Sequence, residues 1–103
     1  MANTKLLEAV FEARIKAKPL IEIDEIARWW IPLDMTHIVN QSLGMRLHPG
    51  IGKFMDLPIW QADAVGAPTK DTPVMWIEST SKSWRVTILN DYRVEVVNAM
   101  PIL

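Results

Sequence analysis

The chain has 103 residues, half of them hydrophobic, which is typical of one folded domain. Eleven Lys and Arg residues against 12 Asp and Glu residues give a net charge of −1, which argues against a basic nucleic-acid binder. The absence of cysteine excludes disulfide frameworks, thiolate metal sites and cysteine nucleophiles. We therefore expect a single domain, residues 1–103, of the α+β class. Its N-terminal helix and two short helices would pack on an antiparallel sheet that ends in a three-stranded meander.

No targeting signal is expected at the start of the chain. Glu8 and Glu12 interrupt the apolar residues of the first 20 positions, so the apolar core of a secretory signal is missing. No uncharged apolar stretch approaches the roughly 18 residues that a membrane span needs. We expect a cytoplasmic protein with no membrane partner.

Residues 4–17 are predicted to form an amphipathic helix, because apolar residues recur there at helical spacing and charged residues take the opposite face. Pro19 prevents its continuation. Glu12 and Lys16 lie four residues apart in the order that favours an ion pair on a helix surface.

Two short helices are predicted in the middle of the chain. Asp24 is a candidate N-cap for a helix over residues 25–30. Asp34 repeats this arrangement as the cap of a helix over residues 35–43, and Gly44 is placed to end it in the left-handed conformation.

From residue 45 onward the apolar period changes from 3.6 to 2, which indicates strands. Residues 45–47 and 55–57 are predicted to pair as a hairpin, with Arg46 opposite Asp56 on its polar side. Residues 61–73 contain few large apolar side chains. They are predicted to form a loop that is either functional or mobile.

The C-terminal third has the most regular alternation of apolar and polar residues, which predicts an antiparallel meander over residues 74–97. A three-residue turn, 89–91, would join its last two strands. The register that collects the apolar side chains on one face also sets Glu78 opposite Arg85, and Arg85 opposite Glu95. An outward row of alternating charge is therefore expected.

Three features resemble functional motifs but lack essential parts. The glycines and lysine of residues 50–53 lack the first glycine and the following hydroxyl residue of a phosphate-binding loop. The only two histidines, His37 and His48, do not have a metal-ligand spacing. The Ser-x-x-Lys string at 79–82 lacks its companion motifs. We expect no catalytic residue, no metal site and no cofactor.

The five tryptophans are the one compositional oddity. Two interpretations stay open: core packing, which suits three of the five, and a binding or subunit surface, where tryptophan is enriched. Trp76 falls on the outer side of the predicted meander, where another chain or a ligand would have to cover it. The candidate binding surface consists of Trp76, Trp60, Trp30, Arg85, Glu78 and His48.

The leading hypothesis is a small non-enzymatic interaction module that self-associates, as a homodimer or a higher homo-oligomer, through the outer sheet face or the sheet edge. A protein or a small ligand is a further partner, whereas nucleic acid is not expected, because the basic residues are dispersed. The alternative is a small-molecule-binding protein or small enzyme with a pocket near residues 48–76. The size would suit an accessory protein of a mobile element or phage, although no motif indicates one.

Overall fold

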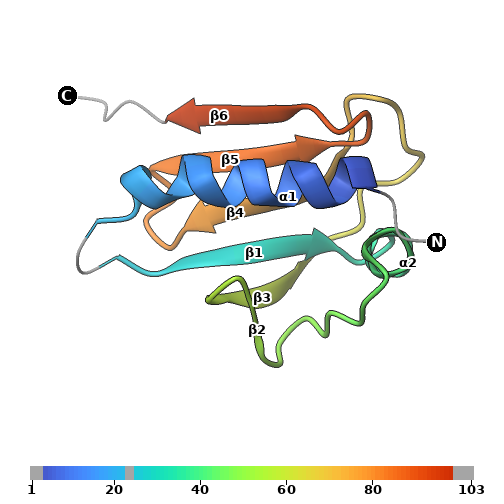
Figure 1. Ribbon diagram of the computed structural model, residues 1–103, viewed down its shortest axis with the longest axis horizontal. Helices are drawn as coiled ribbons and strands as arrows, with labels where there is room; N and C mark the ends of the chain where they lie inside the picture. The colour runs from blue at the N-terminus through green and yellow to red at the C-terminus, as the bar shows by residue number, and fades with distance from the viewer. Residues whose placement is uncertain (1–3, 23–24, 99–103) are drawn as a thin grey trace.

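Helix α1, Thr4–Ala17, packs against one face of a six-stranded mixed sheet, as Figure 1 shows. The computed structural model describes residues 4–22 and 25–98. The remaining elements are the 3-10 turn η1 (Lys18–Leu20), β1 (Ala27–Pro32), α2 (Thr36–Leu43), β2 (Lys53–Phe54), β3 (Leu57–Ala62), β4 (Pro73–Ser79), β5 (Trp84–Leu89) and β6 (Val94–Asn98). The predicted α+β class is confirmed, but the sheet is not purely antiparallel.

The strand order is β2-β3-β1-β4-β5-β6, and neighbours run antiparallel except β1 and β3, which are parallel. A parallel pair needs a crossover connection, and the chain makes it through α2, which lies at the end of β1 (Figure 1). The sheet face toward α1, here called the inner face, forms the core with the helix. Its fully buried side chains include Val10, Ala13, Trp29, Ile31, Met75, Ile77, Val86 and Ile88.

Helix α1 has the predicted bounds. Lys16 Nζ lies 2.8 Å from Glu12 Oε2, so the predicted ion pair on its exposed side is confirmed. No helix in residues 4–22 or 25–98 is both long and apolar enough to span a membrane.

The predicted helix over residues 25–30 is wrong, because residues 27–32 form β1 in the interior of the sheet. Its side chains alternate between the two faces, so Trp29 is fully buried on the inner face while Trp30 lies on the other. Pairing with β3 on one side and β4 on the other satisfies the backbone of β1. The candidate cap Asp24 lies outside the described residues.

Helix α2 confirms the second short helix, and Gly44 ends it in the left-handed conformation at φ 67° and ψ 30°. The predicted capping role of Asp34 is wrong. Met35 occupies the N-cap position and makes no side-chain cap bond. The Asp34 carboxylate instead accepts hydrogen bonds from the backbone N–H groups of Val65 and Gly66, at 3.1 Å each.

The hairpin predicted between residues 45–47 and 55–57 is also wrong. Leu47 donates its backbone N–H to the Asn40 side chain at 2.8 Å and accepts from the Asn40 amide at 3.2 Å, so its backbone needs no strand partner. The observed hairpin joins β2 to β3 through Met55 and Asp56, whose φ values of 49° and 66° suit a tight two-residue turn.

The meander β4-β5-β6 is present, but only its first predicted register is confirmed. Glu78 lies opposite Arg85 between β4 and β5. Between β5 and β6 the register is shifted by two residues, so Arg85 lies opposite Val97 and the predicted contact with Glu95 is wrong. The cause is a longer turn, in which Tyr92 adopts φ 70° and donates its N–H to the Leu89 carbonyl at 2.8 Å.

Candidate binding surface on the outer face of the sheet

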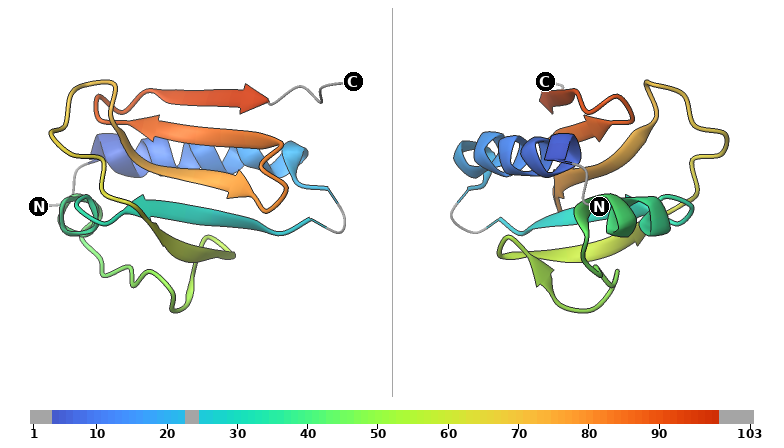
Figure 2. Two further views of the ribbon diagram at one scale, coloured as in Figure 1. Left: turned by 180° about the vertical axis from the view of Figure 1, so that it is seen from behind. Right: turned by 45° about the vertical axis from the view of Figure 1, so that its right-hand side comes forward.

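The sheet face opposite α1, here called the outer face, has neither helix lying over it. Seen from behind in Figure 2, the strands lie in front of α1, and α2 lies at the end of the sheet. In most α+β domains an uncovered sheet face presents polar residues to solvent. Large apolar residues on this face would therefore indicate a binding surface.

Three tryptophans from adjacent strands form a row across the outer face. Trp30 of β1 lies between Trp60 of β3 and Trp76 of β4 as their direct strand partner. The rings of Trp30 and Trp60 have centroids 5.9 Å apart at an interplanar angle of 49°. Trp60 is the most accessible of the three, with 44% of its surface exposed.

A second row, of charged residues, runs beside the tryptophans. Arg28, Glu78 and Arg85 are consecutive strand partners on β1, β4 and β5. The Arg28 guanidinium carbon lies 4.1 Å from the Trp60 ring centroid, and that of Arg85 lies 4.7 Å from the Trp76 ring centroid. Arg85 also donates Nε–H to Glu78 Oε2 at 2.8 Å. Cation–π contacts thus join the two rows into one surface, which we call the tryptophan face.

The burial of Trp76 within its own chain contradicts one prediction from the sequence. We expected another chain or a ligand to cover this ring, yet only 8% of it is exposed in the isolated chain. Its strand partners Trp30 and Thr87 and the Arg85 side chain surround it. Its Nε1 is buried and has no hydrogen-bond partner among the described residues, which is costly for an indole N–H.

Beside Trp76, the outer face is hollowed over β4, β5 and β6. The hollow has a volume of about 350 Å³, and Glu78, Arg85, Thr87, Glu95 and Val97 are among its lining residues. Val97 is 56% exposed there. The tryptophan face therefore continues into a shallow depression that carries both signs of charge.

The structure brings together five of the six residues of the sequence-based candidate surface, all but His48. His48 lines a separate hollow of about 480 Å³ near the end of α2, together with His37, Asn40 and Arg46. Within the described part of the chain, no group of three His, Cys, Asp or Glu residues is placed to hold a metal ion. Arg28 was missed because the sequence placed it on a helix.

The serines at the β4–β5 turn contact one another. The hydroxyl of Ser81 lies 3.0 Å from that of Ser79 and 2.9 Å from that of Ser83. Ser81 and Ser83 line a hollow of about 910 Å³ together with Glu22 and Glu25, and the Glu25 carboxylate accepts the Trp84 indole N–H at 2.6 Å. A nucleophilic serine needs an adjacent base to take its proton. Among the described residues these hydroxyls are hydrogen-bonded to one another and to the Ser83 backbone N–H, and to neither Glu22 nor Glu25.

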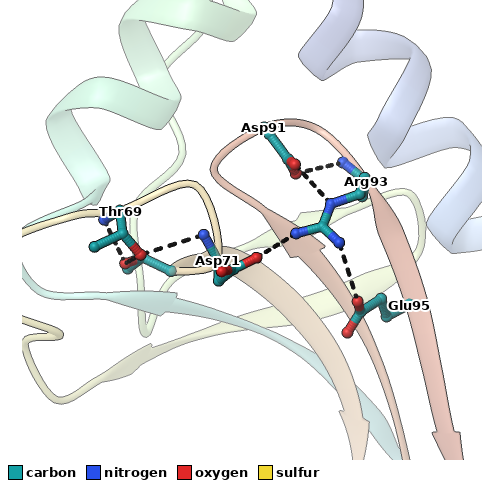
Figure 3. Close-up of polar contacts among 6 residues, drawn as sticks. Thr69, Asp71, Asp91, Arg93 and Glu95 are labelled. Carbon is teal, nitrogen blue, oxygen red and sulfur yellow. Dashed lines mark hydrogen bonds and ion pairs between the residues drawn. The ribbon is translucent and has the colours of Figure 1, made fainter.

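The loop between β3 and β4 is held at both ends, at one end by Asp34 and at the other by Arg93, whose contacts Figure 3 shows. The Arg93 guanidinium donates to the carboxylates of Asp71 and Asp91, the latter at 2.6 Å, and lies 3.7 Å from Glu95. Asn90 adds a backbone hydrogen bond to the Thr72 carbonyl at 2.8 Å. These contacts position the loop at one end of the tryptophan face.

Replacing Arg93 with glutamine should free this end of the loop, so the Asn90 amide should exchange with solvent several-fold faster. The desolvation of Asp91 is outweighed by hydrogen bonds from the Arg93 backbone and guanidinium, which lower the pKa of Asp91. A lowered folded-state pKa stabilises the contact above the ordinary carboxyl pKa of about 4, and this stabilisation is lost as the pH falls through the lowered value. The protection of the Asn90 amide, which is its exchange rate compared with that of an unstructured peptide at the same pH, should therefore decrease in acid.

Arg46→Gln is the control for this prediction, because Arg46 is exposed and makes no ion pair with any described residue. Its Asn90 exchange should match that of the wild type. Equal exchange in the Arg93 and Arg46 variants, measured by NMR, would show that Arg93 does not hold the loop.

Comparison with known proteins adds no assignment: no family model, no curated protein and no solved structure matches this chain. The functional argument therefore rests on the surface itself.

Proposed function

We propose that this protein is a small non-enzymatic interaction module that binds another protein through the tryptophan face. One observation carries the proposal: three tryptophans on adjacent strands, two of them in cation–π contact with arginines, lie on a sheet face that neither α1 nor α2 covers. Tryptophan and arginine are the residue types that most often dominate the binding energy of protein interfaces.

The charges of the face favour a polypeptide partner over nucleic acid. Arg85 is paired with Glu78 at 2.8 Å, and Glu95 adds a second carboxylate to the adjacent hollow. Aromatic platforms for single-stranded nucleic acids lie in positively charged grooves instead. Arg28 makes no ion pair with a described residue, so it is available to a carboxylate of the partner.

We further propose that the module self-associates and acts in the cytoplasm. The lack of cysteine suits a reducing compartment, although it does not require one. The serine hydroxyls bond to one another and to no carboxylate among the described residues, which supports a binding role over an enzymatic one.

The proposal is tested by affinity capture from the cells that produce the protein, using wild type and three single variants. Trp60→Ser removes the exposed ring of the tryptophan face, and Arg28→Ser removes its half-buried neighbour. Ile15→Ser is the matched control, because Ile15 is 71% exposed and lies on α1, on the other side of the sheet. We expect wild type and control to retain the same partner, and each face variant to bind it about tenfold more weakly or worse, as for interface anchors.

Two results would contradict this function. If Ile15→Ser loses the partner and the face variants keep it, α1 is the binding surface. If no protein is retained by the wild type above the level of the face variants, the tryptophan face does not bind a protein. Circular dichroism of each variant shows whether the fold is kept.

A further inference from the structure

The outer edge of β6 carries backbone groups without a strand partner among the described residues. In an antiparallel pair, successive residues alternate between bonding to the neighbour and pointing away from it. Leu89 donates its N–H to the Arg93 carbonyl at 2.9 Å, so the alternation turns Glu95 and Val97 toward β5. The N–H and C=O groups of Val94, Val96 and Asn98 therefore point away from the sheet.

The two edges of the sheet differ in how they are protected. At the far edge, β2 has two residues, one of them Lys53, and follows Gly52 at φ 76°. Strand β6 has five residues with no proline, lysine, glycine or bulge. Val96 and Val97, on its two faces, are 41% and 56% exposed. Proteins protect sheet edges with short strands, lysine, proline or bulges, and an edge without these features can pair with a strand of another chain. Strand β6 is such an edge.

We propose that two copies of this chain pair through β6, antiparallel, about a two-fold axis at Val96, and so form one continuous sheet. In this register Val96 faces its own counterpart, Val94 faces Asn98, and Glu95 faces Val97 of the other copy. All five residues of β6 are paired, and the outward N–H and C=O groups of Val94, Val96 and Asn98 all find partners.

Other registers fit less well. An axis at Glu95 would set two like charges directly opposite each other, which is unfavourable in a strand pair. An axis at Val97 would pair only three residues of β6, Val96, Val97 and Asn98, with β6 of the other copy. Strand β2 is too short to pair with a further copy at the opposite edge. Pairing through β6 therefore gives a closed dimer and not a fibre.

The pairing specifies the proposed self-association, and it does not depend on the tryptophan face binding another protein. Residues that face each other across an antiparallel pair lie on the same side of the sheet, so both tryptophan faces would point in one direction. A partner with two binding sites would then be held by both, with a gain in avidity.

Single cysteine substitutions test the register, because the chain has no cysteine of its own. Facing residues of a hydrogen-bonded pair have Cα atoms about 5.5 Å apart, which a disulfide spans. Val96→Cys should therefore form a covalent dimer of twice 11.8 kDa under mild oxidation. Val94→Cys and Asn98→Cys should each form no covalent dimer, since identical positions would be about 13 Å apart along the strands, but a mixture of the two should cross-link.

Mass measurement by light scattering separates this proposal from the proposed function. Wild type and Trp60→Ser should both be dimers, and Val96→Pro should be a monomer, because proline removes an outward N–H that β5 does not use. A monomeric wild type, or efficient cross-linking of Val94→Cys but not Val96→Cys, would overturn the pairing and leave the tryptophan face untouched. Dissociation by Trp60→Ser alone would instead make that face the self-association surface. The cross-linking result stands even if Val96→Pro does not fold.

Discussion

Replacing Trp29 with alanine is expected to lower the free energy of unfolding by about 3–5 kcal/mol, as is typical when a large aromatic side chain is removed from a packed core. The Trp29 side chain is fully buried on the inner face. Its ring lies 5.4 Å from that of Phe54, and its Nε1 donates to the Phe54 carbonyl at 2.8 Å. The substitution removes both the packing and the hydrogen bond that ties β2 to the core. Chemical denaturation followed by circular dichroism measures the loss.

Two further variants separate these contributions. Trp29→Phe keeps an aromatic ring but leaves the Phe54 carbonyl unpaired, so its cost should be intermediate, at about 1–3 kcal/mol. Trp60→Ala, on the outer face, should cost about 1 kcal/mol or less, because 44% of that ring is already exposed. Equal losses for Trp29→Ala and Trp60→Ala would contradict the assignment of the two rings to opposite faces.

Helix α1 and the β4-β5 pair could be predicted because each has one buried face. In α1 the buried residues repeat at helical spacing. In β5 the inner-face residues Trp84, Val86 and Ile88 alternate in the sequence with Arg85 and Thr87. In such an element, a shift by one residue would turn the whole apolar set toward solvent. The local pattern is therefore sufficient to define both elements.

Strand β1 could not be identified from its own residues. A short apolar run between two acidic residues and a proline suits a buried strand and a short capped helix equally well. Its partners are distant in sequence: Trp29 lies beside Ile59 of β3 and Ile77 of β4. These long-range contacts determine that the segment is a strand, and they cannot be seen in the spacing of the apolar residues within it.

The error in the β5–β6 register has a different origin. A shift by two residues keeps every side chain on its face, so the apolar pattern cannot distinguish Val94 from Val96 as the partner of Val86. The turn decides it, through the left-handed Tyr92. The predicted pairing of Arg85 with Glu95 was chemically reasonable, yet Glu95 lies near Arg93 instead.

The candidate surface was predictable in part, for reasons that follow from these elements. The outward positions of Trp76, Glu78 and Arg85 depend on the β4-β5 register, which the pattern defines. Trp30 and Trp60 were included only because tryptophan is frequent in interfaces. The position of Arg28 on the outer face follows only from the identification of β1 as a strand. The binding role of the surface remains a proposal.

Trp76 should give the second large effect, because its ring is only 8% exposed although it lies on the outer face. We expect Trp76→Ala to lower the free energy of unfolding by about 3 kcal/mol, at the lower end of the range for buried aromatic side chains. This contrasts with the expectation from the sequence, in which another chain or a ligand covers the ring, so that its removal weakens association more than it destabilises the monomer. Denaturation at several protein concentrations distinguishes the two, since a loss that arises from association depends on concentration.

Trp76→Phe should behave differently from Trp76→Ala, because the buried Nε1 has no hydrogen-bond partner among the described residues. Phenylalanine loses some apolar contact but also removes an unpaired N–H, whose burial costs about 1–3 kcal/mol. The two effects oppose each other, so the free energy of unfolding should stay within about 1 kcal/mol of the wild type. If Trp76→Phe is as unstable as Trp76→Ala, the indole N–H is hydrogen-bonded in solution, and the ring is held by that bond as well as by Arg85 and Trp30.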